Sequence, residues 1–218
     1  ISTFCLTFGQ QDKAKIFWNS LSTELVTKVP IADDESLENG QVQISVRFSG
    51  TKQFQKIGEP VKIEKSDIDD IKEVSISSDI FESMDGFSEG VSVEFKTEIW
   101  DRVGNSALGE IGDSVLTIDE TIPVATSLKV VSSNKENPLI ANPKDSITFI
   151  LIVNEPIRPP SFIINDDDFI GELVSDKSWK YIYKPEDVDD GLISFEIIYE
   201  DIAKNPGLVL TKGTNSEE

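Results

Sequence analysis

The chain has 218 residues, among them 20 basic and 40 acidic residues and no histidine, and its formal net charge is −20. Nucleic acids and anionic membranes repel such a charge, and no run of about 18 apolar residues occurs. We therefore expect no nucleic-acid partner and no insertion into a membrane. Without histidine, Ser-His and Cys-His catalysis, imidazole-ligated zinc and the commonest general base near neutral pH are excluded.

The chain opens with an apolar, strand-like segment, residues 2–8, that contains the single cysteine, Cys5. One cysteine excludes an internal disulfide, and the apolar neighbours predict a buried structural thiol rather than a nucleophile. No basic-then-apolar signal peptide opens the chain. We expect it to be an excised or processed part of a longer protein.

Apolar and polar residues then alternate in several segments, most clearly residues 41–48, 91–99 and 191–199. Alternation of this kind predicts strands with one buried face. Residues 146–153 are apolar on both faces at their centre, which predicts a strand buried in the middle of a sheet. Two short segments favour helix, residues 78–84 and 184–190. Many short strands separated by turn clusters predict antiparallel β-sandwiches.

An internal repeat sets the number of domains. The pair Asp101 and Asn105 returns as Asp201 and Asn205, 100 residues further along, and each pair follows a glycine and a long alternating strand. Pro123 ends one module and redirects the chain into the next. The sequence therefore predicts two domains, residues 1–122 and 123–218.

The residues of this repeat resemble the prokaryotic Ig-like repeats of large surface and secreted proteins. The resemblance is carried by "EIWDRVGNSALGEIGDSVLTIDETIP" (98–123), "ANPKDSITFILIVNEPI" (141–157) and "VDDGLISFEIIYEDIAKNPG" (188–207). It implies an all-β fold of two tandem immunoglobulin-like antiparallel β-sandwich domains joined by a short linker. The second copy departs from the pattern, because Lys204 replaces the glycine found at Gly104 and no closing "ID-T-P" follows.

The resemblance also implies a role. We expect a structural module of a long extracellular protein, such as a stalk, a filament or a surface-layer building block. Its partners would be neighbouring repeats of the same chain and identical chains in a lattice. An adhesin or carbohydrate-binding module is the alternative, and a non-catalytic appendage of a secreted enzyme is a third. We expect no enzymatic activity, because a sandwich of this size offers few deep clefts.

The repeated acidic turn has two interpretations. In the structural one, the carboxylates of Asp101 and Asp201 accept backbone N–H groups, while Asn105 and Asn205 adopt the left-handed conformation. In the functional one, the same oxygens bind calcium. The sequence favours a structural turn.

The linker offers a more specific calcium hypothesis, and calcium is the one cofactor that the sequence leaves open. Asp101, Asp113, Asp119 and Glu120 would converge where the two modules meet and stiffen the linker by binding an ion. The alternative is that these carboxylates are solvated charges at an exposed strand end.

Two further groups of residues invite functional hypotheses. The acidic segments 166–168 and 186–190 lack the spacing of an EF-hand, so they indicate extended surface loops more than cation sites. Trp18, Trp100 and Trp179 would form a carbohydrate platform if they met on one surface. Because each lies in or beside a strand-like segment, packing in or near the cores is the favoured interpretation.

Overall fold

The computed structural model describes residues 2–7, 16–112, 114–185 and 191–211. The chain divides into two compact units, unit 1 (Ile1–Glu120) and unit 2 (Thr121–Glu218). The division falls two residues before the end of the predicted first domain. Each unit has its own two sheets and its own core, so the predicted all-β fold of two sandwiches is confirmed.

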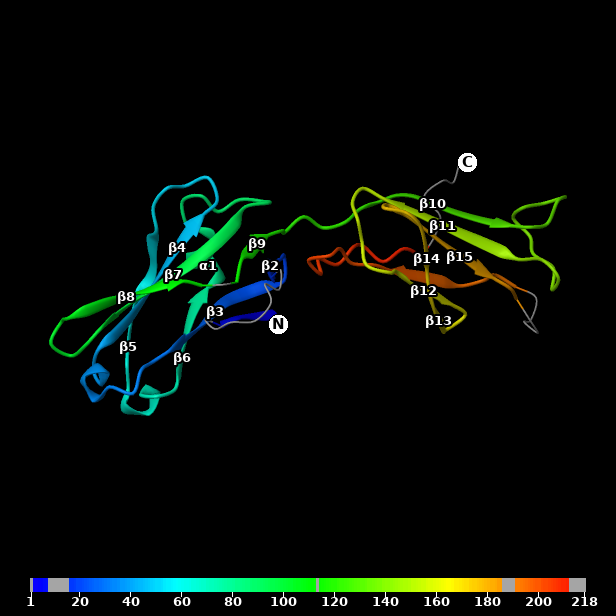
Figure 1. Ribbon diagram of the computed structural model, residues 1–218. Helices are drawn as coiled ribbons and strands as arrows, with labels where there is room; N and C mark the ends of the chain where they lie inside the picture. Colours follow the sequence, from blue (N-terminus) through cyan, green and yellow to red (C-terminus); the bar gives the residue numbers. More distant parts are fainter. Residues whose placement is uncertain (1, 8–15, 113, 186–190, 212–218) are drawn as a thin grey trace. The chain divides into compact units, whose positions relative to one another are not determined.

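Unit 1 contains nine strands and three short helical segments among its described residues (Figure 1). The strands are β1 (Ser2–Thr7), β2 (Ile16–Trp18), β3 (Ser22–Pro30), β4 (Gln41–Phe48), β5 (Gln55–Lys62), β6 (Ile71–Ser77), β7 (Ser92–Trp100), β8 (Ser106–Ile111) and β9 (Leu116–Ile118). The helical segments are η1 (Glu35–Leu37), η2 (Lys65–Asp67) and α1 (Ser78–Glu82). The helix predicted within residues 78–84 is confirmed.

The larger sheet of unit 1 has the order β2-β9-β7-β4-β5, with β8 also pairing β7, and the smaller sheet has the order β1-β3-β6. Most pairs are antiparallel, but β1 with β3 and β2 with β9 are parallel. The core lies between the sheets and is built from the alternating residues of β4 and β7 with α1. Its largest fully buried side chains are Trp18, Phe48, Phe81 and Phe95.

One polar residue of β4 departs from the predicted alternation. Gln43 is buried although it lies between Val42 and Ile44. A register shift in the pairing of β4 with β5 occurs at this point. The Gln43 amide donates to the carbonyls of Ile44 and Ile57, both at 2.9 Å, so its burial costs little.

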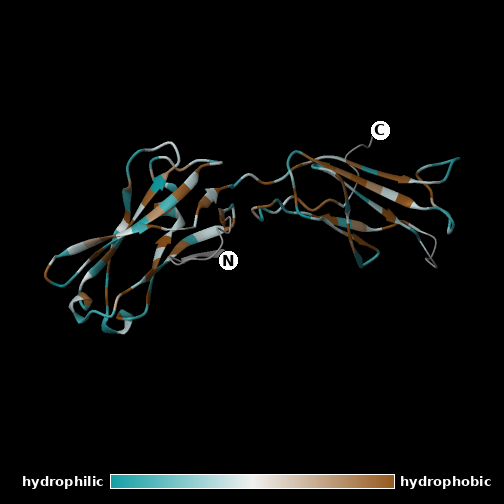
Figure 2. Cartoon of the chain, in the orientation of Figure 1, coloured by the Kyte–Doolittle hydropathy of each residue, from teal (hydrophilic) through white to brown (hydrophobic). Residues whose placement is uncertain are grey.

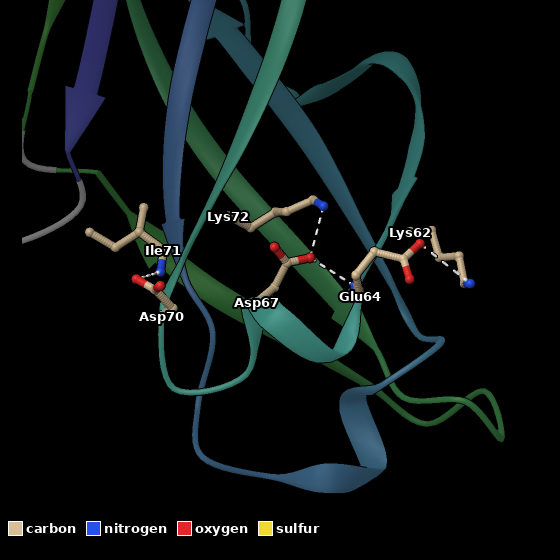
Figure 3. Close-up of polar contacts among 6 residues, drawn as sticks. All are labelled: Lys62, Glu64, Asp67, Asp70, Ile71 and Lys72. Carbon is tan, nitrogen blue, oxygen red and sulfur yellow. Dashed lines mark hydrogen bonds and ion pairs between the residues drawn. The ribbon is translucent and has the colours of Figure 1, made fainter.

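The connection from β5 to β6 is fixed by a polar network around η2 (Figure 3). The Glu64 N–H donates to Asp67 Oδ2 at 2.7 Å, and Lys72 Nζ donates to the same oxygen at 2.8 Å. Desolvation raises the pKa of Asp67, but the hydrogen bonds from Lys72 and Glu64 outweigh it and hold that pKa below the ordinary 3.8. The network therefore keeps the turn closed while Asp67 is ionised.

Unit 2 contains seven strands among its described residues. They are β10 (Ala125–Ser132), β11 (Ile147–Val153), β12 (Ser161–Ile164), β13 (Asp167–Ile170), β14 (Glu172–Ser175), β15 (Ser178–Tyr183) and β16 (Phe195–Ile198). One sheet has the order β10-β11-β15-β14 and the other β13-β12-β16, and every strand pair is antiparallel. Phe149, Leu151, Phe162, Ile164 and Ile197 are fully buried between them.

The prediction for residues 146–153 is half right. β11 does lie inside its sheet, between β10 and β15, and Phe149 and Leu151 are buried. The opposite face of the strand is open, however, and Ile152 is 41% exposed. Figure 2 shows hydrophobic residues along much of this strand.

No helix in the described parts of the chain is long and apolar enough to cross a membrane. Three predictions fall outside what the structure describes. These are the side chain of Cys5, the residue Asp113, and the second predicted helix, whose acidic segment spans residues 186–190.

Candidate functional site

The first acidic turn joins β7 to β8 in unit 1. The Asp101 N–H donates to the Asn105 carbonyl at 2.9 Å. Asp101 Oδ1 accepts the N–H groups of Val103 at 3.0 Å and Asn105 at 2.8 Å, and its Oδ2 accepts Asn105 Nδ2 at 2.7 Å. Both oxygens of the carboxylate are thus used to close the turn.

The second turn repeats this geometry in unit 2. The Asp201 N–H donates to the Asn205 carbonyl at 3.1 Å. Asp201 Oδ1 accepts the Asn205 N–H at 2.8 Å, and Oδ2 accepts Asn205 Nδ2 at 2.8 Å. In both modules, therefore, the Asp carboxylate and the Asn amide hold the two ends of the turn together.

The two turns differ in burial. Asn105 is exposed and Asp101 is half-buried, whereas Asp201 is 1% and Asn205 0% exposed. A buried carboxylate is costly unless it is hydrogen-bonded, so the second turn depends more strongly on its internal bonds. The sequence alone gave no sign of this difference.

The left-handed residue of each turn is not the one predicted. Gly104 has φ of +92° and Lys204 has φ of +71°, while Asn105 and Asn205 do not have positive φ. The prediction for the two asparagines was wrong because their amides bind the Asp carboxylate, and the chain reverses one residue earlier. At this position the exchange of glycine for lysine carries a conformational cost.

The hydrogen bond from the Asn105 side chain, with those from the backbone of the turn, holds the pKa of Asp101 below the ordinary 3.8 despite some desolvation. The turn is also tied to η1, because the Arg102 N–H donates to the Ser36 carbonyl at 3.1 Å. Asp101 therefore stays ionised over the physiological range and acts as an acceptor within the protein.

The structure does not bring Asp101 together with Asp119 and Glu120. β9 pairs with the beginning of β7, at Ser92 and Val93, whereas Asp101 follows the end of β7. Eight residues of strand separate the two places, about 26 Å at roughly 3.3 Å per residue. Figure 1 shows β8 and β9 at opposite ends of β7. The four-carboxylate arrangement expected from the sequence is therefore wrong for Asp101.

Asp119 and Glu120 lie at the end of unit 1, just after β9. The Asp119 N–H donates to the Trp18 carbonyl at 2.8 Å, and Trp18 Nε1 donates to Glu120 Oε1 at 3.2 Å. The Glu120 N–H donates to Glu89 Oε2 at 2.9 Å. These bonds fix the last two residues of unit 1 to its core.

The pKa of the Glu120 carboxyl is raised by its surroundings. Burial, followed by the charge of Glu82, with a smaller effect of Glu89, raises its pKa above the ordinary 4.5, and the Trp18 hydrogen bond only partly opposes this. Sequence reasoning missed Glu82 and Glu89, because they come from α1 and the loop after it. Only the pairing of β9 with β7 brings them near Glu120.

Unit 2 has a carboxylate pair of its own. Carboxylate oxygens of Glu155 and Asp201 lie within 4.8 Å of each other. Ile157, which follows Glu155 closely, forms an antiparallel bridge with Asp201. Glu155 lies in the segment 141–157 that carries the resemblance, but nothing in the sequence pairs it with the acidic turn.

The acidic residues 166–168 belong to a tight hairpin. Asn165 and Asp166 have φ of +49° and +70° and form the turn between β12 and β13. The hydroxyl of Ser161 donates to the carboxylate of Asp168 across this strand pair. The segment is therefore a hairpin turn rather than an extended loop.

The three tryptophans do not form a platform. Trp18 is 0% exposed in the core of unit 1, and Trp179 is 5% exposed in the core of unit 2. Trp100 is half-buried on the larger sheet of unit 1, with Lys56 Nζ 5.2 Å from its ring centre. The interpretation as core packing is confirmed for Trp18 and Trp179.

An apolar groove of about 580 Å³ opens on unit 2. Its lining comes from the end of β10, residues 138–142, the start of β11 and residues 191–195. None of its described lining residues has a titratable side chain.

No family model and no curated protein matches the chain. Solved structures that are similar to this chain include the fibronectin(III)-like modules of Clostridium thermocellum CbhA, with 10% identity and a TM-score of 0.47, over 92% of this chain and 88% of that one. They also include the FN1–FN3 domains of chicken CNTN1, with 12% identity and a TM-score of 0.47, over 92% of this chain and 62% of that one.

Proposed function

We propose that this chain is a structural two-module segment of a long extracellular surface protein, serving as a stalk, filament or surface-layer building block. The observation that supports this best is the repeated turn. Asp101 with Asn105 and Asp201 with Asn205 close the two sandwiches with the same hydrogen bonds. Two modules that each enclose a core and share one fastening device are what a repeating spacer requires.

The partners in this proposal are neighbouring repeats of the same chain and identical chains. The net charge of −20 keeps the surface hydrated and opposes unspecific aggregation. Without a disulfide inside the chain, resistance to unfolding comes from the strand ladders and the two cores.

We propose that calcium, where it is present, binds near Asp119 and Glu120 and stiffens the end of unit 1. Burial is the largest cause of the raised pKa of Glu120, and the charges of Glu82 and Glu89 add to it. A divalent cation would relieve the repulsion among these carboxylates. The test is the melting temperature in calcium and in chelator. Calcium should raise the melting temperature of the native chain more than that of Glu120→Gln, and superimposable curves would remove the metal from the proposal.

Stretching single chains tests the mechanical role. At about 3.6 Å per extended residue, unit 1 should release roughly 43 nm and unit 2 roughly 35 nm, less the folded length of each. We expect two separate unfolding events. One event that releases the combined length would contradict a chain of independent modules.

Ligand binding is the second candidate, supported by the apolar groove of unit 2 and by half-buried Trp100 beside Lys56. A glycan array with the native chain, Trp100→Ala and Trp179→Phe tests it. Specific binding that only Trp100→Ala removes would favour a carbohydrate-binding module. Absence of binding favours the structural role.

A further inference from the structure

The larger sheet of unit 1 has one face on its core and one face turned to solvent. Val93, Phe95 and Thr97 of β7 are buried on the core side. Because side chains alternate along a strand, the residues between them point to the other side. We call this solvent side the outer face of unit 1, and it carries Arg47, Phe54, Lys56, Glu94, Lys96, Glu98 and Trp100.

An aromatic ring and an ion pair meet at one place on the outer face. Arg47 Cζ lies 4.7 Å from the centre of the half-buried Phe54 ring. Arg47 also faces Glu94 across the pair of β4 and β7, and its Nε donates to Glu94 Oε2 at 2.8 Å. We call these three residues the Phe54 group.

The same combination occurs a second time. Lys56 Nζ lies 5.2 Å from the centre of the half-buried Trp100 ring and 3.9 Å from Glu98 Oε2. We call these three residues the Trp100 group. The Lys56 side chain is 64% exposed and flexible, so it can move aside when a ligand covers the ring.

The two groups follow each other along β7. Glu94 and Glu98 are four residues apart, which is about 13 Å at roughly 3.3 Å per residue. Lys96 lies between them, with Nζ 5.9 Å from the Phe54 ring centre. Within the described part of the chain, no carboxylate forms an ion pair with Lys96. Three cation–π contacts on one sheet face are dense, because about one occurs in 70–80 residues of protein.

This combination of side chains fits a ligand with many hydroxyl groups and no charge. The negative face of an aromatic ring attracts the C–H groups of a sugar ring. Carboxylates accept hydrogen bonds from hydroxyls, and lysine and arginine donate to them. An anionic polymer would be repelled by Glu94 and Glu98 and by the net charge of −20.

The charges also argue against a stable protein interface on this face. The centre of such an interface is usually depleted of charged residues. The centre of the outer face instead holds Lys96 between two ion pairs.

We propose that the outer face of unit 1 binds a neutral, linear polysaccharide along β7, with sugar units on both the Phe54 group and the Trp100 group. This rests on ligand binding, the second candidate function, and names its surface and the class of its ligand. Two similar groups in line suit a ligand whose own units repeat, because binding at one group raises the effective concentration at the other.

Affinity electrophoresis of the full chain through gels that contain hydroxyethyl cellulose, xylan or mannan tests the proposal. At least one polymer should retard the native chain. Phe54→Ala and Trp100→Ala should each weaken this binding at least about tenfold, because each removes one stacking ring. Leu192→Ala is the control, since it removes an exposed apolar side chain from the groove of unit 2 and should leave binding unchanged. Circular dichroism checks that each variant is folded.

Titration calorimetry with oligosaccharides of the retarding polymer tests the use of both groups. The native chain should bind the hexasaccharide at least about tenfold more tightly than the disaccharide, because only the longer ligand reaches both rings. In Trp100→Ala this difference should disappear. Added salt should leave the Kd nearly unchanged, because the ligand carries no charge to be screened.

The outcomes separate this proposal from the others. A chain that none of the three polymers retards would overturn it, and so would ring variants that bind like the native chain. Retardation that only Leu192→Ala weakens would place the site in the groove, so that ligand binding would stand without this surface. The two-module structural proposal is tested by stretching and does not depend on any of these results.

Discussion

Lys204 occupies in the second turn the left-handed backbone position that Gly104 occupies in the first, with φ of +71° and +92°. Glycine adopts this conformation without cost, whereas a side chain at Cβ crowds the following carbonyl. The same fastening turn is therefore built without strain in unit 1 and with strain in unit 2.

Lys204→Gly should raise the free energy of unfolding of unit 2 by about 1 kcal/mol, because it relieves this strain. Lys204→Ala is the control, since it removes the lysine charge but keeps Cβ, and it should change little. Urea unfolding measures both. If the two substitutions raise the free energy of unfolding equally, the destabilisation comes from the lysine charge and not from the left-handed backbone.

Removing the carboxylate should be more costly in the buried turn than in the exposed one. Asp201→Ala leaves the buried N–H and amide of Asn205 without their carboxylate and should cost roughly 2–3 kcal/mol. Asp101→Ala makes the same chemical change in the turn whose Asn105 is exposed, and its N–H groups can turn to water. Urea unfolding of the two variants compares them directly, and a larger loss for Asp101→Ala would refute the argument from burial.

The carboxyl of Glu120 should destabilise unit 1 at neutral pH. Because its folded pKa lies above the ordinary 4.5, the native state holds the proton more tightly than the unfolded chain. The penalty is complete above the folded pKa and disappears below 4.5. Glu120→Gln keeps an acceptor for Trp18 and should stabilise unit 1 by a few tenths of a kcal/mol at pH 7. Unfolding at pH 7 and pH 4 tests this, and a gain that persists at pH 4 would contradict it.

Gly207 should tolerate no side chain. A Cβ there would lie 2.2 Å from Cε2 of Tyr199, whose ring is buried and whose hydroxyl accepts the Ala125 N–H at 3.1 Å. Gly207→Ala should therefore cost about 1–3 kcal/mol through overpacking. Gly191→Ala is the control, because a Cβ at that position meets no atom of the described residues within 4 Å. Thermal unfolding distinguishes them, and equal melting temperatures would show that Tyr199 can move aside.

Much of the fold could be predicted because alternation is strong in the central strands. Val42, Val46 and Phe95 are buried as their spacing indicates, and the repeated turn marked the second module. Gln43 could not be assigned, because its burial depends on a register shift in the pairing with another strand. The open face around Ile152 was missed because a fully apolar strand looks the same whether one face or both are covered.

The candidate site was less predictable. The hydrogen bonds between Asp101 and Asn105 follow from residue types close in sequence. The environment of Glu120 depends on Glu82 and Glu89, which only the folded sheet brings near it. Asp101 was grouped with Asp119 because the two are close in the chain, yet the length of β7 keeps them apart.

The central claim is that each unit closes its own sandwich and fastens it with its own Asp–Asn turn. Amide hydrogen exchange on the native chain and on Asp201→Ala tests it most directly, because exchange reports the stability of each unit separately. We expect the amides of β10 to β16 to lose protection while those of β3 to β9 keep it. Equal loss of protection in both units would show that they unfold as one, and would contradict the account.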